Sequence, residues 1–277
     1  MIDGMSAKFR TLVAAGLALG ALSLPAAAGG SIKDAPAEEG RKLTWSFNLA
    51  GTSDYVFRGI SQTDNDPTLQ GGLDLSYGIF YAGVWASGLD FSAAGNDADI
   101  EIDWYGGIKP VWGAATFDFG VIYYTYPDGN FQAPIVGPDL NYFEFKAGVS
   151  GAFFPALPAL TMGATVFYSP DYFGETGSTW TVEGTLAYTF NAIGPVTPTV
   201  SALIGYQDGS DAAYLAFNGF DSYTYYNVGL TLAVDKLSFD FRYWGTSDAE
   251  NAVSNGLTCI NNYCEDRFVF TAKVALP

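Results

Sequence analysis

Alternation of polar and apolar residues with a period of two is the sequence feature that most restricts the fold of this chain. It is clearest in three segments: 99–105 (DIEIDWY), 179–186 (TWTVEGTL) and 237–244 (LSFDFRYW). In the first of these, the acids fall on one face and the Ile and Trp residues on the other. Side chains alternate between the two faces of a β-strand, whereas an α-helix brings together residues three or four positions apart. The pattern therefore predicts strands with one polar and one apolar face.

The same period recurs along the chain and predicts about twelve strands. They are placed at 43–58, 68–78, 80–91, 99–109, 114–126, 141–151, 160–169, 178–190, 197–207, 222–234, 236–246 and 265–276. A tilted strand of about 9–11 residues is long enough to cross a bilayer, and single-chain bacterial barrels have an even number of strands. Most of the predicted strands reach that length.

The connections between these strands alternate in length. Short ones fall at 78–79, 110–113, 153–159, 191–196 and 234–236, and longer polar ones at 59–67, 92–98, 127–140, 170–177, 208–221 and 247–264. Short periplasmic turns with longer extracellular loops are typical of outer-membrane barrels. The sequence therefore predicts an all-β fold, a transmembrane, antiparallel, up-and-down β-barrel of about twelve strands.

Composition favours this barrel over a soluble β-sandwich, which would show the same alternation. Aromatic residues make up 16% and charged residues only 15% of the 277 residues, and the mean hydropathy is +0.14. A soluble domain usually carries about 25% charged residues. Aromatic residues also cluster at predicted strand ends, for example at 123–126 and 243–244, where the interfacial girdles of a membrane barrel would lie.

The N-terminal region is typical of a secretory signal peptide. Lys8 and Arg10 precede an apolar stretch at 11–24, and Ala26–Ala28 supply the small residues of a cleavage site. A transmembrane anchor is the alternative, but the stretch is shorter than the roughly 20 residues that a spanning helix needs. We therefore expect cleavage near Ala28 and export to the outer membrane of a Gram-negative bacterium. The expected parts are a signal peptide at 1–28, an N-terminal periplasmic segment at 29–42 and the barrel at 43–277.

The residue types present exclude several classes of function. The chain contains no His, which removes His-based triads, general bases and metal sites. Its 12 basic and 29 acidic residues give a net charge of −17, which argues against binding to nucleic acid. The acidic segments 64–66 and 208–211 lack the register of a calcium loop and consist of ordinary turn residues. We expect no cofactor, no metal and no enzymatic activity, since no pair of acids has a spacing that marks a carboxylate-based mechanism.

The polar face of each strand would line the lumen, because a Lys or Arg facing lipid at the bilayer midplane costs about 2–4 kcal/mol. Alternation then places eleven charged residues inside: Asp74, Glu101, Asp103, Asp118, Glu144, Lys146, Glu183, Asp240, Arg242, Arg267 and Lys273. Seven of these are acidic and four basic, so an open lumen would weakly prefer cations. The alternative is a plugged lumen, in which Glu144, Lys146, Asp240 and Arg242 pair with one another. The size of the barrel does not decide between an open and a plugged lumen. About eight strands fill their own interior and about sixteen leave a channel, and twelve lie between these cases.

Asp54 and Arg58 fall in phase at the extracellular end of the first predicted strand, and we place both at the pore mouth. Arg58 there is either a positive constriction that opposes the acidic wall or a structural partner of Asp54 or of an acid on a neighbouring strand. The structural role is favoured, because confined charges are usually paired.

The two cysteines, Cys259 and Cys264, lie close together in the last long loop, just before the last predicted strand. Exported proteins fold in an oxidising compartment, where two nearby cysteines form a disulfide more readily than a metal site. We therefore expect a disulfide that staples this loop.

Residues 47–77 (FNLAGTSDYVFRGISQTDNDPTLQGGLDLSY) carry a family resemblance, in which 52–62 and 69–72 are the most specific parts and 83–87 (GVWAS) continue the match. This stretch closely resembles the signature of the TorF family, porin-type proteobacterial outer-membrane proteins of uncharacterised function. The resemblance implies an outer-membrane, porin-like barrel and little about the solute. Many such barrels end in an aromatic residue that is recognised during assembly, whereas this sequence ends in Val-Ala-Leu-Pro at 274–277.

The sequence favours a channel for passive diffusion of small hydrophilic solutes, with a weak preference for cations. The alternative is a closed structural or surface-interaction barrel that acts through its loops, and conductance separates the two. The expected partners are outer-membrane lipid and lipopolysaccharide, small hydrophilic solutes or cations, and the barrel-assembly machinery during biogenesis.

Overall fold

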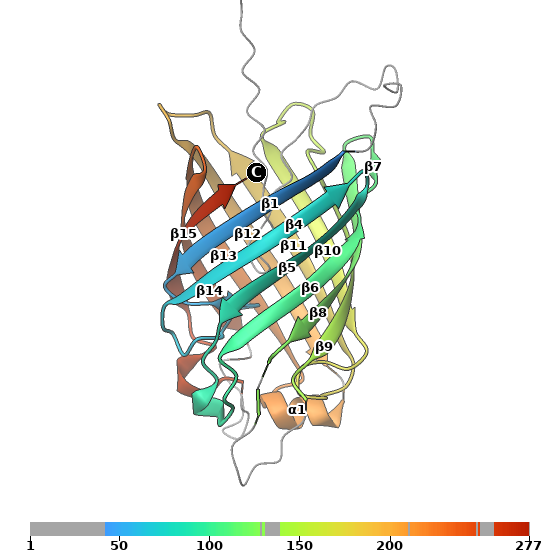
Figure 1. Ribbon diagram of the computed structural model, residues 1–277, viewed down its shortest axis with the longest axis vertical. Helices are drawn as coiled ribbons and strands as arrows, with labels where there is room; N and C mark the ends of the chain where they lie inside the picture. The colour runs from blue at the N-terminus through green and yellow to red at the C-terminus, as the bar shows by residue number, and fades with distance from the viewer. Residues whose placement is uncertain are drawn as a thin grey trace, which may run out of the picture.

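Twelve strands form a closed antiparallel barrel in this protein (Figure 1). The computed structural model describes residues 42–127, 129–130, 139–209, 211–247, 249 and 258–276. The predicted signal peptide, 1–28, and residues 29–41 of the predicted periplasmic segment lie outside these ranges. Within the ranges, no α-helix is both long and apolar enough to cross a membrane.

Strands that follow one another along the chain are neighbours in the barrel. In order they are β1 (Leu43–Thr52), β4 (Thr68–Tyr77), β5 (Phe80–Gly88), β6 (Ile100–Ile108), β8 (Ala115–Thr125), β9 (Tyr142–Gly151), β10 (Leu160–Ser169), β11 (Thr179–Thr189), β12 (Thr197–Gly209), β13 (Ser222–Val234), β14 (Leu237–Ser247) and β15 (Arg267–Leu276). β15 pairs with β1 and closes the sheet, so none of these twelve strands has a free edge. The predicted all-β, up-and-down barrel of twelve strands is confirmed.

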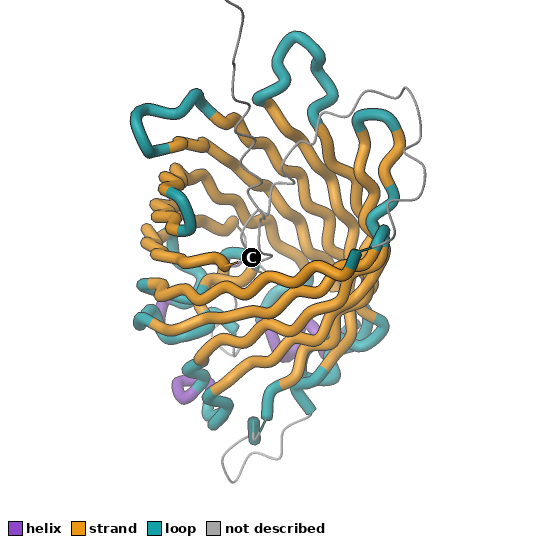
Figure 2. The backbone as a smooth tube through the Cα atoms, turned by 45° about the horizontal axis from the view of Figure 1, so that its top comes forward, coloured by secondary structure: helices purple, strands orange, loops and turns teal. Residues whose placement is uncertain are grey.

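The two ends of the barrel differ (Figure 1). One end, at the top of the figure, has the short connections, including the two-residue strand β7 (Val111–Trp112). The other end has the long connections and contains α1 (Ala212–Asn218) and two 3₁₀ turns, Ser92–Ala94 and Ile260–Asn262. We call these the short-turn end and the long-loop end. Figure 2, turned so that the short-turn end comes forward, shows the strands running around a single axis with the helical turns at the far end.

The apolar faces of the strands point outward. On β6, Glu101 and Asp103 are buried, whereas Trp104 remains 55% exposed. Phe143 on β9 and Phe268 on β15 are likewise exposed on the outer face. An outer surface of exposed aromatic and aliphatic side chains is suited to contact with lipid. The alternation in the sequence therefore corresponds to an inner polar face and an outer apolar face.

Glycines on the inner face make room for tyrosines of the neighbouring strand. Tyr105 pairs directly with Gly83, and Tyr225 pairs directly with Gly205. A Cβ added to Gly205 would lie only 2.2 Å from Cζ of Tyr225, so the ring covers the glycine backbone. This position brings the Tyr225 hydroxyl to the Glu183 carboxylate, to which it donates at 2.7 Å.

The first strand is shorter than predicted. β1 ends at Thr52, and a separate two-stranded sheet follows, formed by β2 (Val56–Phe57) and β3 (Ile60–Ser61). Between them, Arg58 and Gly59 have φ values of 50° and 84°. Positive φ at both central residues is what a type I′ hairpin turn requires. The prediction of one strand over 43–58 is therefore wrong, because the chain reverses direction at Arg58–Gly59.

Candidate functional site

The segment between β1 and β4 folds into the barrel instead of extending beyond it. Arg58, at the tip of the β2–β3 hairpin, is 4% exposed, and it reaches Glu144 on β9. β4, β5, β6 and β8 separate β9 from β1 along the wall, so this contact spans the lumen. We call residues 53–66 the plug segment. Its position near the long-loop end obstructs the lumen at that level.

Arg58 fastens the tip of the plug segment to the opposite wall. Its Nη1 and Nη2 donate to Oε1 and Oε2 of Glu144, both at 2.8 Å, in a two-pronged ion pair. Nη1 also donates to Oε1 of Gln207 on β12 at 3.1 Å. The Tyr124 hydroxyl donates to the same Glu144 carboxylate at 2.9 Å. Three strands of the wall therefore contribute to one buried polar cluster around the guanidinium.

The guanidinium of Arg58 keeps its charge in this buried place. Burial opposes the charge, but the facing carboxylate of Glu144 and the smaller contributions of Tyr225, Tyr172 and Tyr124 together outweigh it and raise the pKa of Arg58 above its ordinary value. The rings of Phe57 and Phe167 lie with their centroids 4.8 Å and 5.0 Å from Cζ of Arg58, and each adds a cation–π contact. Arg58 does not lie on the first strand as expected, because the hairpin turn carries it across the lumen. It is paired, as the favoured structural role expected, but its partner is Glu144 and not Asp54 or an acid on a neighbouring strand.

Asp54 holds the base of the plug segment. Its carboxylate accepts hydrogen bonds from the hydroxyls of Ser61 at 2.7 Å and Thr63 at 2.9 Å. It also accepts from Nη1 of Arg267, the first residue of β15, at 2.8 Å. Arg267 donates in addition to the carbonyl oxygen of Tyr263 at 2.7 Å. Asp54 and Arg267 together therefore tie the plug segment to the wall and to the last long loop.

Two acids beside the plug segment lack a basic partner within the described part of the chain. Glu101 and Asp103 are neighbours on the inner face of β6 and are 2% and 0% exposed. Tyr126 donates to Glu101 at 3.4 Å, while neither carboxylate oxygen of Asp103 has a hydrogen-bond partner among the described residues. Burial, followed by the nearby charges of these two acids, raises the pKa of Tyr55 in the plug segment well above its ordinary value.

Toward the short-turn end, acids and bases are matched in ion pairs, within one strand or between neighbouring parts of the wall. Nζ of Lys146 lies 2.9 Å from the Asp118 carboxylate, and Nζ of Lys109 lies 3.8 Å from it. Arg242 donates to the two Asp240 oxygens at 3.0 Å and 2.9 Å. The plugged-lumen hypothesis expected Glu144, Lys146, Asp240 and Arg242 to pair with one another. Asp240 and Arg242 do so, whereas Lys146 pairs with Asp118 and Glu144 with Arg58.

A cavity of about 150 Å³ lies between the plug segment and this matched region. Its wall includes Asp54 from the plug segment, and Asp240, Arg242 and Lys273 from β14 and β15, together with neutral side chains. The wall is therefore polar and charged, as an aqueous passage requires.

The eleven charged residues that alternation places in the lumen occupy two levels. Four lie at the long-loop level: Glu101, Asp103, Glu144 and Arg267. The others lie nearer the middle or the short-turn end: Asp74, Asp118, Lys146, Glu183, Asp240, Arg242 and Lys273. Of the acids in this second group, Asp74 and Glu183 accept hydrogen bonds from Tyr105 at 2.6 Å and Tyr225 at 2.7 Å.

Comparison with known proteins identifies the family. The model of a family described as "Bacterial protein of unknown function (Gcw_chp)" matches residues 36–275. The chain belongs to this family. No curated protein sequence matches it.

The fold of this Gcw_chp protein is found in solved outer-membrane barrels. The structure titled "KdgM porin" is similar with a TM-score of 0.51 at 8% identity, over 84% of this chain and 98% of that chain. The structure titled "NanC porin structure in rhombohedral crystal form" has a TM-score of 0.48 at 9% identity, over 83% and 99%. "LpxR from Salmonella typhimurium" has a TM-score of 0.43 at 10% identity, over 83% and 99%. At such low identity the likeness to KdgM shows the barrel fold alone.

Two parts of the site in this Gcw_chp protein were missed by sequence reasoning. Lys109 was placed at the end of a strand, although it reaches Asp118 from a short connection. Residues 53–58 of the plug segment are predicted as the end of the first strand and 59–66 as part of a long connection, although alternation on both sides of Arg58–Gly59 is also the signal of a two-residue hairpin. That signal was available in the sequence, whereas the partner of the hairpin across the lumen was not.

Cys259 and Cys264 form a disulfide in the loop that contacts the plug segment. The Ser61 amide donates to the carbonyl of Tyr263 in this loop at 2.9 Å. Replacing both cysteines by Ser is expected to destabilise the loop locally by about 2 kcal/mol, the loop-closure term for so short a ring. Limited proteolysis should cleave the variant faster within 258–266, while thermal unfolding of the barrel stays unchanged. Equal cleavage rates in the two proteins would contradict this expectation.

Proposed function

We propose that this Gcw_chp protein is a porin-like channel of the Gram-negative outer membrane for passive diffusion of small hydrophilic solutes. In this proposal the plug segment closes the channel at the long-loop end, which faces the outside of the cell. The barrel fold shared with KdgM supports the proposal. The resemblance of residues 47–77 to the TorF family agrees with it. The proposal includes cleavage near Ala28, assembly by the barrel-assembly machinery, and contact with outer-membrane lipid and lipopolysaccharide.

The observation that carries the proposal is that a loop, and not the barrel wall, obstructs the lumen. The cavity of about 150 Å³ beneath the plug segment shows that the inward side chains of the twelve strands leave part of the interior unfilled. The plug segment is held by the Arg58–Glu144 and Asp54–Arg267 ion pairs, which are side-chain contacts that water can replace. The charged cavity beneath it supplies the wall of an aqueous passage once the segment moves. A channel with a removable obstruction accounts for the side-chain attachment of the plug segment and for the charged cavity beneath it.

We further propose that the weak preference for cations comes from acids that have no ion-pair partner. Four acids pair with bases, namely Asp54, Asp118, Glu144 and Asp240. Four others lack such a pair within the described ranges, namely Asp74, Glu101, Asp103 and Glu183. Lys273 is the lumen base without an ion pair there, so the acids without an ion pair outnumber the bases without one. Acids that are ionised and open to a narrow passage raise the local concentration of cations.

A closed structural or surface-interaction barrel is the second candidate. The buried, two-pronged Arg58–Glu144 pair favours it, because such a pair fixes the plug segment firmly at the level where solutes would pass. In that case the function would depend on the long loops, and no solute would cross the barrel.

Single-channel recording tests the two candidates. Protein purified from outer membranes is inserted into a planar bilayer under a potassium chloride gradient. A variant in which residues 55–63 are replaced by a short Gly-Ser linker serves as the open reference. Steps in the variant with a reversal potential toward potassium support the channel, and fewer or smaller steps in the unmodified protein support its closed state. A folded variant without steps refutes the channel, and a reversal potential toward chloride refutes the cation preference.

A further inference from the structure

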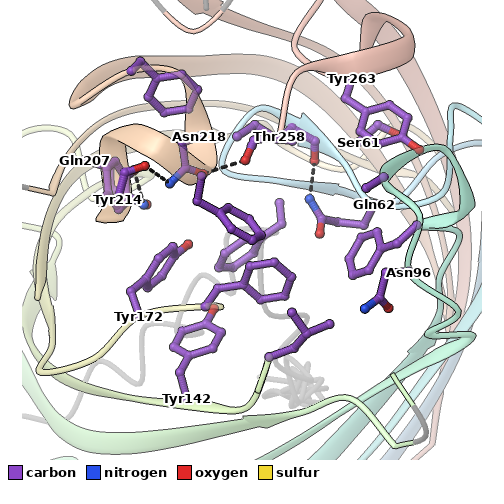
Figure 3. A pocket seen from close by; sticks show the side chains of 18 of the residues that line it. Ser61, Gln62, Asn96, Tyr142, Tyr172, Gln207, Tyr214, Asn218, Thr258 and Tyr263 are labelled. Atoms are coloured by element: carbon purple, nitrogen blue, oxygen red, sulfur yellow. Dashed lines mark hydrogen bonds between the residues drawn. The ribbon is translucent and has the colours of Figure 1, made fainter. Parts of the chain in front are cut away.

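A second cavity, of about 90 Å³, lies on the other side of the plug segment, among the long loops (Figure 3). Phe57, Ile60, Ser61 and Gln62 of the plug segment form part of its wall. The rest comes from the other long connections and the adjoining strand ends, so segments far apart in the sequence meet here. Five Phe and six Tyr are among the 20 described residues that line it, and none of these 20 is charged. The cavity is therefore an aromatic, electrically neutral compartment.

The rings of this wall contact one another mainly edge to face. The Phe173 centroid lies 5.2 Å from that of Tyr126 and 5.9 Å from that of Phe217, with interplanar angles of 80° and 79°. The Tyr142 and Tyr172 centroids are 4.7 Å apart at 61°. Edge-to-face contacts are the favoured arrangement between aromatic rings. A further ring placed in this cavity would find neighbours for the same kind of contact.

Most polar groups of the wall are already hydrogen-bonded to one another. The Gln207 amide donates to the Tyr214 hydroxyl at 3.0 Å, and the Thr258 hydroxyl donates to Oδ1 of Asn218 at 2.6 Å. The Gln62 amide donates to a backbone carbonyl of the plug segment at 3.0 Å. A ligand therefore gains little by competing for these groups.

Asn96 is the exception. It is 2% exposed, and its Oδ1 accepts from the Ala98 amide at 2.9 Å, which fixes which way the side-chain amide faces. Its Nδ2 has no hydrogen-bond partner within the described ranges and points toward the cavity in Figure 3. A buried donor without a partner costs stability, and a ligand that brings an acceptor removes that cost.

We propose that this cavity binds a small, uncharged, single-ring aromatic compound whose carbonyl oxygen accepts a hydrogen bond from Nδ2 of Asn96. Size limits the ligand to at most one ring, and the loops around the cavity must spread to admit it, since benzene fills an apolar cavity of about 150 Å³ and this cavity measures about 90 Å³. A charged ligand would lose its hydration with no opposite charge in the wall. A sugar would bring several hydroxyls to a largely aromatic wall in which the described Gln207–Tyr214 and Thr258–Asn218 pairs already bond each other, so most of its hydroxyls would stay unpaired.

Titration calorimetry with four probes tests the proposal on the full protein in lipid nanodiscs. Acetophenone carries the ring and the carbonyl, toluene only the ring, benzoate a charge, and glucose several hydroxyls. We expect acetophenone to bind roughly three- to tenfold more tightly than toluene, the factor given by one neutral hydrogen bond. We expect no binding of benzoate or glucose at the same concentrations. Tighter binding of glucose or benzoate, or no binding of acetophenone, would overturn the proposal.

Two matched variants assign the contact. Asn96→Asp keeps the acceptor for the Ala98 amide but removes the Nδ2 donor, so the affinity for acetophenone should fall at least to that of toluene. Asn48→Asp makes the same change at another buried amide that lacks a partner for Nδ2 within the described ranges, but Asn48 lines the cavity beneath the plug segment. That control should bind acetophenone like the unmodified protein. Equal affinities of the two variants would contradict the role of Asn96, and since binding is read without current, the result does not depend on conductance.

Discussion

Arg58→Ala is expected to convert a barrel that rarely conducts into one that conducts in frequent, discrete steps. The substitution removes the three hydrogen bonds that Arg58 makes to Glu144 and Gln207 of the wall, and it leaves Glu144, which is 0% exposed, as a buried charge without its ion partner. Breaking a buried ion pair in this way costs about 3–5 kcal/mol. In the variant, the closed state is destabilised by that amount relative to the open state, in which the plug segment is released and water reaches Glu144. The closed-to-open ratio should therefore fall by about two orders of magnitude or more.

Planar-bilayer recording measures this change, and a double variant separates loss of charge pairing from loss of bulk. Arg58→Met with Glu144→Gln removes both charges, fills the space and keeps an acceptor for the Tyr124 hydroxyl. Replacing a buried ion pair by neutral groups of similar volume is often neutral or stabilising, so this variant should close again. If Arg58→Ala gives no more steps than the unmodified protein, the ion pair does not hold the channel shut. If the double variant conducts as often as Arg58→Ala, the unpaired charge of Glu144 is not the cause.

The barrel was predictable because its constraint is local and repeated. Each strand has one face toward the lumen and one toward lipid. On β6, the apolar residues Ile100, Ile102 and Trp104 therefore alternate with the acids Glu101 and Asp103. Short and long connections then place the strand ends without knowledge of distant contacts. The number and order of the strands could therefore be obtained from the sequence.

The plug segment was not predictable in the same way. Its alternation continues that of β1, and the reversal depends on a positive φ at Arg58, which a residue other than Gly seldom adopts. Even with the hairpin recognised, the partner Glu144 lies on β9, and the contact depends on how the closed wall brings β9 opposite β1. The aromatic cavity depends on several loops that are separate in the sequence. Pairings across a lumen have no short-range signal.

Arg242→Ala is expected to produce the largest loss of barrel stability among the lumen substitutions considered for this protein. Its guanidinium donates to Ser201 on β12 at 3.0 Å, to Asn227 on β13 at 2.6 Å and to Asp240 on β14 at 2.9 Å. One side chain therefore links three consecutive strands. Gly229 leaves the space for it, since a Cβ there would lie 2.8 Å from Cζ of Arg242.

The expected loss is about 3 kcal/mol, at the lower end of the cost of breaking a buried ion pair, because the Asp240 side chain keeps 21% exposure and water can partly replace its partner. Urea unfolding in detergent, followed by the gel shift between folded and unfolded barrel, measures the loss. Adding Asp240→Asn should recover part of it, since the remaining amide is neutral and can still accept from Thr231. A loss below about 1 kcal/mol would mean that the three-strand link behaves like an exposed ion pair. A loss without recovery would place the cost in the bonds to Ser201 and Asn227, and the wall would then depend on neutral hydrogen bonds more than on paired charge.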